Sequence, residues 1–470
     1  MVETIGIQMK NIQIHIIVTS LLIDTSFLTG CSHFSEPATQ PITPDITYPN
    51  HWGISPSHQP SNQTIKKIFE NIKLQKLIQE AYQNNQNLKA TAKRLNESRI
   101  SAQIQGVQHR PIITSDTSAT KNQDTEQYKL NLNISWEWDI WGKLATQTEA
   151  VNAELKARQV DYDAAKFSLK IQITQNWFES IAIAHQIQLA QKNLESFNIT
   201  QSIIESGYRT GVNPALDVHL TKASVANAKQ QLEQQKNALN LKKRQLEVLI
   251  GRYPSGTIII EHHLPKLKNT PDAGIPSTIL SQRYDLMVAQ HQLKAKLLQW
   301  KVTHKNLLPQ FNLTGSTGFS SAQLLKLLDP DELLWSLTTQ VLQPIFDSGI
   351  SKAQRDIEQA QYEQAVHQYA HTVLVAFQEV ESALTTEQSL RQQIDSLIEA
   401  ENESKKAEQL AMENYRSGLT DIITLLESQR RRFSSQQAVV NLHNEQLQNR
   451  LKLYLALGAA VDNSINATNN

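Results

Sequence analysis

The sequence predicts a mainly α-helical protein with a membrane β-barrel portion, built from an internally duplicated unit. Three observations support this fold class: two long stretches free of proline and glycine, one segment in which apolar and polar residues alternate, and a turn motif that occurs twice. Each copy of the unit is expected to run strand, strand, long helix, sharp turn and second helix.

The composition of the chain excludes several classes of protein. Among 470 residues, 45 Lys+Arg balance 45 Asp+Glu, so the formal net charge is zero and no nucleic-acid partner is expected. The mean hydropathy of −0.41 excludes a bundle of membrane-spanning helices. The single cysteine, Cys31, excludes an internal disulfide framework and any multi-cysteine zinc site.

The N-terminus resembles a bacterial lipoprotein signal. Met9-Lys10 opens an apolar segment that is too short and too interrupted to span a bilayer, and this segment ends in Leu28-Thr29-Gly30-Cys31. We interpret residues 1–30 as a signal peptide whose true start is Met9, and Cys31 as the lipidation site, which carries a diacylglycerol and an N-acyl chain. The alternative is an ordinary cleaved signal followed by a stray or buried cysteine.

The segment that follows is interpreted as a lipidated linker over residues 31–62. It is rich in Pro, Ser, Thr, His and Gln, a composition typical of an extended chain. Ser32, rather than an aspartate, follows the cysteine, which favours passage to the outer membrane of a Gram-negative cell.

The duplication is clearest around two turns. Tyr208-Arg-Thr-Gly211 matches Tyr415-Arg-Ser-Gly418, and the register then holds without a gap to the end of each copy. Long helices are predicted over 143–207 and 350–414, followed by helices over about 214–250 and 421–457. Each long stretch would span roughly 100 Å at about 1.5 Å per residue, so the two hairpins are predicted to be coiled-coil arms.

The residues at the turns agree with this prediction. Gly211 and Gly418 suit the left-handed conformation that ends a helix. In the first copy, Asn213 is expected to cap the next helix ahead of a proline. In the second copy, Thr420 is expected to supply the capping hydroxyl, and Asp421 a carboxylate that favours the helix dipole.

One segment has the alternation of a membrane strand. It runs from Leu130 to Trp141, and its apolar residues would face lipid while its polar residues face a lumen. The apolar side would carry Leu130, Leu132, Ile134, Trp136, Trp138 and Ile140, and the polar side Asn131, Asn133, Ser135, Glu137 and Asp139. Weaker strands are predicted near 111–120, 311–314 and 333–343. The alternative is a half-buried strand in a soluble sheet.

The number of strands then decides the assembly. Four strands cannot close a barrel, because the smallest membrane barrels need about 8, and an open sheet edge in lipid is prohibitive. The chain must therefore share its strands with copies of itself. A trimer is favoured over a dimer because only its larger barrel leaves a lumen that continues into a tube of helices.

The predicted segments beyond the linker follow the two copies of the unit. They are equatorial helices over 63–107, a first membrane β-hairpin over 108–142, a first helical hairpin over 143–251, an equatorial segment and helix over 252–303, a second membrane β-hairpin over 304–349, a second helical hairpin over 350–458 and a C-terminal tail over 459–470.

Several motifs together resemble the outer-membrane factor family of TolC and OprM, in its lipidated NodT-type branch. Leu74–Leu88 is similar to the first equatorial helix of that family, Asp139–Leu144 to its strand exit and Ala376–Val380 to a motif of its long helix. The paired Tyr-Arg-x-Gly turns agree as well. One departure is Tyr284 between Arg283 and Asp285, where the family usually has proline, and a looser start of that helix is expected.

The resemblance implies a homotrimer whose 12-stranded barrel in the outer membrane continues into a 12-helix periplasmic α-barrel. An equatorial domain would form from 63–100, 252–282 and 459–470. The implied function is the outer-membrane channel of a tripartite efflux pump, which passively conducts substrates delivered by an inner-membrane transporter, of the resistance–nodulation–division kind, and a periplasmic adaptor. Two alternatives are a type I secretion duct and a structural coiled-coil lipoprotein without a pore.

No constellation of catalytic residues is visible in the sequence, so the protein is not expected to be an enzyme. His262-His263 has no acidic partner at metal-ligand spacing and is interpreted as surface. No metal and no cofactor are therefore expected, apart from the covalent lipid on Cys31.

The helix tips are the first candidate site. Gly211 with Val212, and Gly418 with Leu419, place a small residue and an exposed apolar one at each turn. The resemblance implies that these tips dock with the helical hairpins of the adaptor. The alternative is simple turn chemistry with an apolar cap contact.

A periplasmic gate is the second candidate site. By resemblance, the second hairpin forms the inner wall, and Thr424 and Glu427 match two positions where TolC carries a ring of aspartates. Three copies of Glu427 would repel one another, raise their own pKa values and favour cations. The residues Tyr415, Arg416 and Asp421 are expected to tether the closed state. The alternative is that Glu427 pairs with Arg430 or Arg431 on a solvated face.

Overall fold

The computed structural model describes residues 49–53, 69, 71–261, 264–265, 267 and 276–458. The predicted signal peptide, the Cys31 lipidation site, the His262-His263 pair and the C-terminal tail lie outside these residues. Among the helices described, none is long and apolar enough to cross a membrane.

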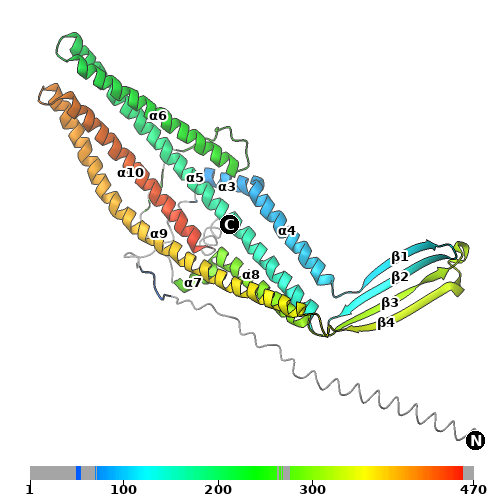
Figure 1. The fold of residues 1–470 in the computed structure, drawn as a ribbon. Coiled ribbons are helices and arrows are strands. Elements are labelled where there is room, and N and C mark those ends of the chain that lie inside the picture. Colours follow the sequence, from blue (N-terminus) through cyan, green and yellow to red (C-terminus); the bar gives the residue numbers. More distant parts are fainter. Residues whose placement is uncertain are drawn as a thin grey trace, which may run out of the picture. The chain divides into compact units, whose positions relative to one another are not determined.

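The structure confirms the predicted duplication and has helices ahead of each strand pair (Figure 1). The elements of the first half are α3 (Ile72–Asn84), α4 (Gln86–Val107), β1 (Ile112–Lys121), β2 (Glu126–Trp138), α5 (Lys143–Arg209) and α6 (Ala215–Leu249). Those of the second half are α7 (Pro276–Gln282), α8 (Tyr284–Lys305), β3 (Gln310–Ser321), β4 (Leu333–Leu342), α9 (Ile350–Arg416) and α10 (Ile422–Leu457).

The long helices α5 and α9 each run for 67 residues without a break. Neither helix contains proline, and α5 contains glycine only at Gly207 in its last turn, so nothing removes a backbone hydrogen bond along most of its length. In Figure 1, α6 folds back along α5 and α10 along α9, as the two predicted hairpins require.

The first long helix begins with a cap that was predicted to be part of the preceding strand. Strand β2 ends at Trp138, so the prediction of a strand to Trp141 was wrong for its last three residues. The Asp139 carboxylate instead accepts hydrogen bonds from the backbone of Leu144, at 3.1 Å, and Ala145, at 2.9 Å. A carboxylate bound to the first free N–H groups of a helix is more stable there than on a strand.

The four strands form one antiparallel sheet in the order β1-β2-β3-β4. The register pairs Thr117 with Leu130 and Trp138 with Phe311, and the predicted polar face is visible where Asp116 accepts hydrogen bonds from the side chains of Asn131 and Asn133. Among the described residues, strands β1 and β4 each have one neighbour in the sheet, so the outer edge of each has no partner there.

The largest cluster of buried apolar side chains lies where α3, α5, α9 and α10 meet. Leu74, Trp177, Val373 and Tyr454 are members of this cluster. Smaller clusters follow the hairpins towards their turns, and one of them, with Ile204 and Leu425, joins the two hairpins near the tips. Burial of apolar surface therefore fixes the two hairpins against each other at both ends.

Helix α8 begins at Tyr284 although proline is absent there. Arg283, which is 6% exposed, holds this start: its guanidinium donates to Asp285 and Glu379, both at 2.7 Å, and to the carbonyl of Ala456 at 3.1 Å. The last contact places a positive charge at the C-terminal end of α10, where the helix dipole favours it. Ion pairs thus stabilise the start of α8 that was expected to be looser.

A short part of the predicted linker is fixed to α9. The Trp52 ring contacts the Phe377 ring edge-on, with 6.2 Å between centroids, and the Gly53 backbone N–H donates to the Glu381 carboxylate at 2.8 Å. Trp52 is buried while its neighbours in residues 49–53 are exposed, so this part of the predicted linker is held against α9 at one side chain.

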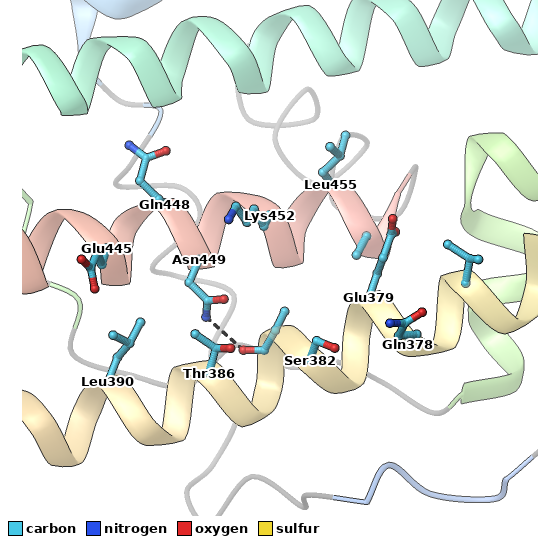
Figure 2. Close-up of a pocket in the computed structure, with 13 residues that line it drawn as sticks. Gln378, Glu379, Ser382, Thr386, Leu390, Glu445, Gln448, Asn449, Lys452 and Leu455 are labelled. Atoms are coloured by element: carbon cyan, nitrogen blue, oxygen red, sulfur yellow. Dashed lines mark hydrogen bonds between the residues drawn. The ribbon is translucent and has the colours of Figure 1, made fainter.

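A groove lies between parts of α9 and α10 (Figure 2). Its volume is about 700 Å³, and its lining includes Ser382 and Thr386 of α9 and Gln448 of α10. Figure 2 shows Gln448 pointing away from α9, and its amide donates to the carbonyl of Gln175 on α5 at 3.0 Å. Asn449 bridges the two helices by donating to the backbone carbonyl of Ala383 at 2.9 Å. The groove follows the second hairpin, and apolar atoms make up most of its lining.

Candidate functional site

The two hairpin turns have the same backbone geometry. Gly211 has φ of +78° and Gly418 has φ of +70°, which confirms the predicted left-handed conformation. The N–H of Val212 donates to the carbonyl of Gly207 at 2.7 Å, and the N–H of Leu419 donates to that of Asn414 at 2.8 Å. These bonds close the C-terminal turns of α5 and α9 in the same manner.

Both turns present the residue pair expected of a docking tip. Val212 is 77% exposed and Leu419 is 76% exposed. A Cβ added at Gly211 or Gly418 would meet no atom within 4 Å, so the space beside each glycine is open. Two small, apolar and solvent-facing tips are thus available to a partner, and docking itself stays a prediction.

The predicted caps Asn213 and Thr420 were wrong, whereas the carboxylate of Asp421 lies at the start of α10 as predicted. Helix α6 begins after Pro214 with no side-chain cap, and the Asn213 amide instead donates to the carbonyl of Ile204 at 3.3 Å. Helix α10 is capped by Asp421, whose carboxylate accepts from the N–H of Thr424 at 2.8 Å, rather than by Thr420. The side-chain hydrogen bond of Thr424, followed by this backbone hydrogen bond, holds the pKa of Asp421 below its usual range.

Asn213 contacts the other hairpin as well. The Tyr415 hydroxyl donates to its side-chain oxygen at 3.3 Å, which links the end of α9 to the start of α6. Around this bond, buried side chains of both hairpins form one apolar cluster, whose buried members are Ile204, Val218, Ala411, Ile422 and Leu425. We call this cluster with its hydrogen bond the tip contact.

Charged groups surround the tip contact. Burial, followed by the nearby charge of Asp421, raises the pKa of Asp217 in the first turn of α6. Burial and then the charge of Asp217 raise the pKa of the Tyr415 hydroxyl. Asp217, Tyr415 and Asp421 therefore interact across the two hairpins, while Arg416 stays exposed on the last turn of α9.

Glu427 pairs with arginines of its own helix, as expected of a solvated face. Its carboxylate contacts Arg430 and also Arg431, the latter at 2.9 Å. The hydrogen bond from Arg431, more than any other interaction, holds the pKa of Glu427 below its usual range. Thr424, the other residue of the proposed ring, is exposed. A ring needs three chains, so it is not tested by the contacts within one chain.

Two polar contacts that position this part of α10 were not predicted from the sequence. Arg432 pairs with Glu408 of α9, and the Gln429 amide donates to the hydroxyls of Ser196 and Thr200 of α5, both at 2.9 Å. The signal for the first contact was a run of three arginines at 430–432, where the first copy has no charge at the matching positions.

No metal site is formed in the part of the chain that the structure covers. There, no three His, Cys, Asp or Glu side chains converge as metal ligands would. The features that the described residues do present are two exposed tips, the contact between them and a charged helix face.

Comparisons with known proteins agree with this geometry. The model of the family described as outer membrane efflux protein matches residues 77–252 and 275–459. The cation efflux system protein CusC of Escherichia coli is 24% identical over 444 residues, which cover 92% of this chain and 96% of CusC. The toluene efflux pump outer membrane protein TtgC of Pseudomonas putida is 26% identical over 463 residues, which cover 93% and 94%.

Solved structures share the fold. The outer-membrane channel OprN superposes with a TM-score of 0.80 at 23% identity, covering 89% of this chain and 99% of OprN. The CmeC outer membrane channel of Campylobacter jejuni gives 0.82 at 22% identity, covering 90% and 95%. The helical hairpins and the sheet of this chain are thus those of outer-membrane channels.

Proposed function

The chain belongs to the outer membrane efflux protein family and is an outer-membrane efflux channel, and from this premise we propose that three copies form its conducting duct. The channel lies in the outer membrane and extends into the periplasm. The proposed duct is passive: substrates arrive from an inner-membrane transporter through a periplasmic adaptor, and the lipid on Cys31 anchors each copy.

The observation that carries this proposal is the pair of open sheet edges. Strand β1 at one edge and strand β4 at the other each have one neighbour in the part of the chain that the structure describes. In lipid, unpaired backbone groups cost several kcal/mol each, so the edge of one copy should pair with the opposite edge of the next. Three copies would supply the twelve strands of the proposed barrel.

The internal duplication supports the same assembly in the helices. Within the chain, Lys305 at the end of α8 donates to the carbonyl of Gly142 at 3.1 Å and to the hydroxyl of Thr146 at 2.7 Å, which fixes the second half on α5. By the repeat, the end of α4 matches the end of α8, and the start of α9 matches the start of α5. The interface between subunits should repeat the contact of α8 with α5, so helix α4 of one subunit should cover the start of α9 in the next subunit.

The side chains at these matching places are apolar and exposed. Val107 is 49% exposed and Ile104 is 57% exposed on α4, while Ile350 is 70% exposed and Ile357 is 51% exposed on α9. Exposed aliphatic side chains at both matching places favour contact with a partner. The interface between subunits would thus be apolar, whereas the corresponding interface within one subunit is held by Lys305.

Cysteine cross-linking tests the proposed trimer. The full lipidated protein with Val107→Cys and Ile350→Cys should form disulfide-linked species up to a trimer after oxidation, whereas either single variant should give no ladder beyond a dimer. A matched control pairs Val107→Cys with Ile199→Cys, which is exposed on α5 and away from the proposed interface. A protein that stays monomeric in mild detergent, with no cross-links, would overturn the trimer.

The tips are proposed to act at the periplasmic end of the duct. Gly211, Val212, Gly418 and Leu419 would meet the hairpins of the adaptor, and the second hairpin would form the inner wall. The tip contact between Tyr415 and Asn213 would then hold the closed state, because it ties the inner hairpin to the outer one.

A further inference from the structure

We infer that the constriction formed by α10 carries a net positive charge and selects anions over cations. The inference rests on the proposed function, since it requires three chains with α10 as the inner wall. It reverses the cation preference that a ring of Glu427 carboxylates would give.

The first support is the side of α10 on which Glu427 lies. Leu425, Gln429 and Phe433 pack inwards and are nearly fully buried. At about 100° per residue, Glu427 lies on the opposite side of α10 from these three residues. The side chains of Arg430 and Arg431 flank it, and each is 74% exposed. The face that would line the constriction therefore consists of one carboxylate between two guanidinium groups.

The second support is the balance of charge on that face. Arg430 and Arg431 share the single carboxylate of Glu427, whereas Arg432 turns away to pair with Glu408 on α9. One positive charge per chain is left without an acidic partner of its own. Arginine stays charged at any pH at which the protein is folded, so this excess is permanent.

The other charges near the tips do not cancel the excess. Asp421 and Arg416 lie closer to the turn and have opposite signs. Arg430 lies roughly 13 Å beyond Asp421 by helical rise, which exceeds the Debye length of about 8 Å at physiological ionic strength. Along α10, the charge at the Glu427 level is therefore that of Glu427, Arg430 and Arg431.

The third support is the first copy of the repeat. The positions that match Glu427 and the three arginines hold Leu220 and Ala223-Ser224-Val225 on α6. Leu220 packs against the tip contact. The basic group is thus present on one hairpin alone, the one proposed to line the duct. Rings of arginine or lysine are the feature that selects anions in pores.

Reversal potentials in planar bilayers test this inference on the full lipidated protein. In a potassium chloride gradient, the wild type should prefer chloride. The double variant Arg430→Gln/Arg431→Gln should lower the chloride-to-potassium permeability ratio by about two- to ten-fold, at the low end of what focused charge does to local ion concentration. Glu427→Gln should raise the ratio, because it removes the carboxylate that Arg430 and Arg431 share.

A control at the same height separates this effect from general surface charge. Lys222→Gln on α6 removes a base that pairs with Glu205 and should leave the ratio unchanged. A channel that prefers potassium, or a double variant with the wild-type ratio, would overturn the inference alone. A wild type with no conductance would overturn the proposed function, and the inference with it.

Discussion

The tips of the two helical hairpins start from the same turn and end in different surroundings. Gly211 and Gly418 have nearly equal φ values, and the residue after each is exposed to the same extent. Further along, Leu220 of α6 packs into the apolar cluster, while Glu427 of α10 faces outwards between two arginines. The comparison teaches that the duplication kept the turn and let the flanking faces diverge.

A second difference lies further along the hairpins. In the second copy, Glu387 and Arg450 form an ion pair with side chains 2% and 0% exposed. The matching residues of the first copy are Ser180, which donates to the carbonyl of Asn176 at 2.7 Å, and Lys243, which is only partly buried. Beside the pair, burial raises the pKa of Tyr454 to about 12. At this level the second hairpin is therefore held by a buried ion pair, where the first has a serine and a half-buried lysine.

The equal turns lead to the prediction with the largest effect. Gly418→Glu and Gly211→Glu should each abolish export while trimers still assemble, because a charged side chain would project from the tip into the partner's site. Gly418→Ala carries the same strain at positive φ, of roughly 1–2 kcal/mol, without the charge. Export assays of cells with each variant check this, and trimers are measured by gel in parallel.

The outcome also tests the comparison itself. Loss of export by Gly418→Glu but not by Gly211→Glu would show that the tips differ in docking despite their equal geometry. Normal export by both variants would contradict docking through the tips.

The buried ion pair of Glu387 and Arg450 gives the prediction with the second-largest expected effect. Arg450→Met should destabilise the second hairpin by about 3–5 kcal/mol, because it leaves Glu387 buried without its partner. Hydrogen exchange along α9 and α10 measures the loss. Glu387→Gln added to Arg450→Met should recover most of it, and Lys243→Met in the first copy should have little effect. Equal losses of stability in Arg450→Met and Lys243→Met would show that the buried ion pair does not distinguish the two hairpins.

The tip contact gives the smallest expected effect. Tyr415→Phe removes the hydrogen bond to Asn213 and should weaken the contact by about 1 kcal/mol, while the ring keeps its apolar packing. The fraction of time that single channels spend open should rise several-fold. Tyr208→Phe is the matched control, because Tyr208 holds the same place in the first copy and is 50% exposed. An open fraction equal to that of the wild type would show that this hydrogen bond does not hold the closed state.

The helices and the sharp turns were predictable because their causes are local. Long stretches of good helix formers without proline fix α5 and α9, and glycine at the left-handed position ends them. The predictions failed at residues whose side chains fit more than one role. Asp139 fits the alternation of a strand but caps a helix. Asn213 resembles a cap but contacts Tyr415 in the second repeat of the same chain.

Sequence by itself determined the long helices, their turns and the duplication, since each follows from neighbours along the chain. The strands were predicted less fully: β3 runs over Gln310–Ser321, where only 311–314 was predicted. Tertiary structure alone decided which distant side chains and helices meet: Arg432 with Glu408, Arg283 with the end of α10, and Trp52 with α9. The reason is physical. Periodicity and turn chemistry are set by short-range backbone geometry, whereas the partner of a charge depends on the packing of helices far apart in the chain.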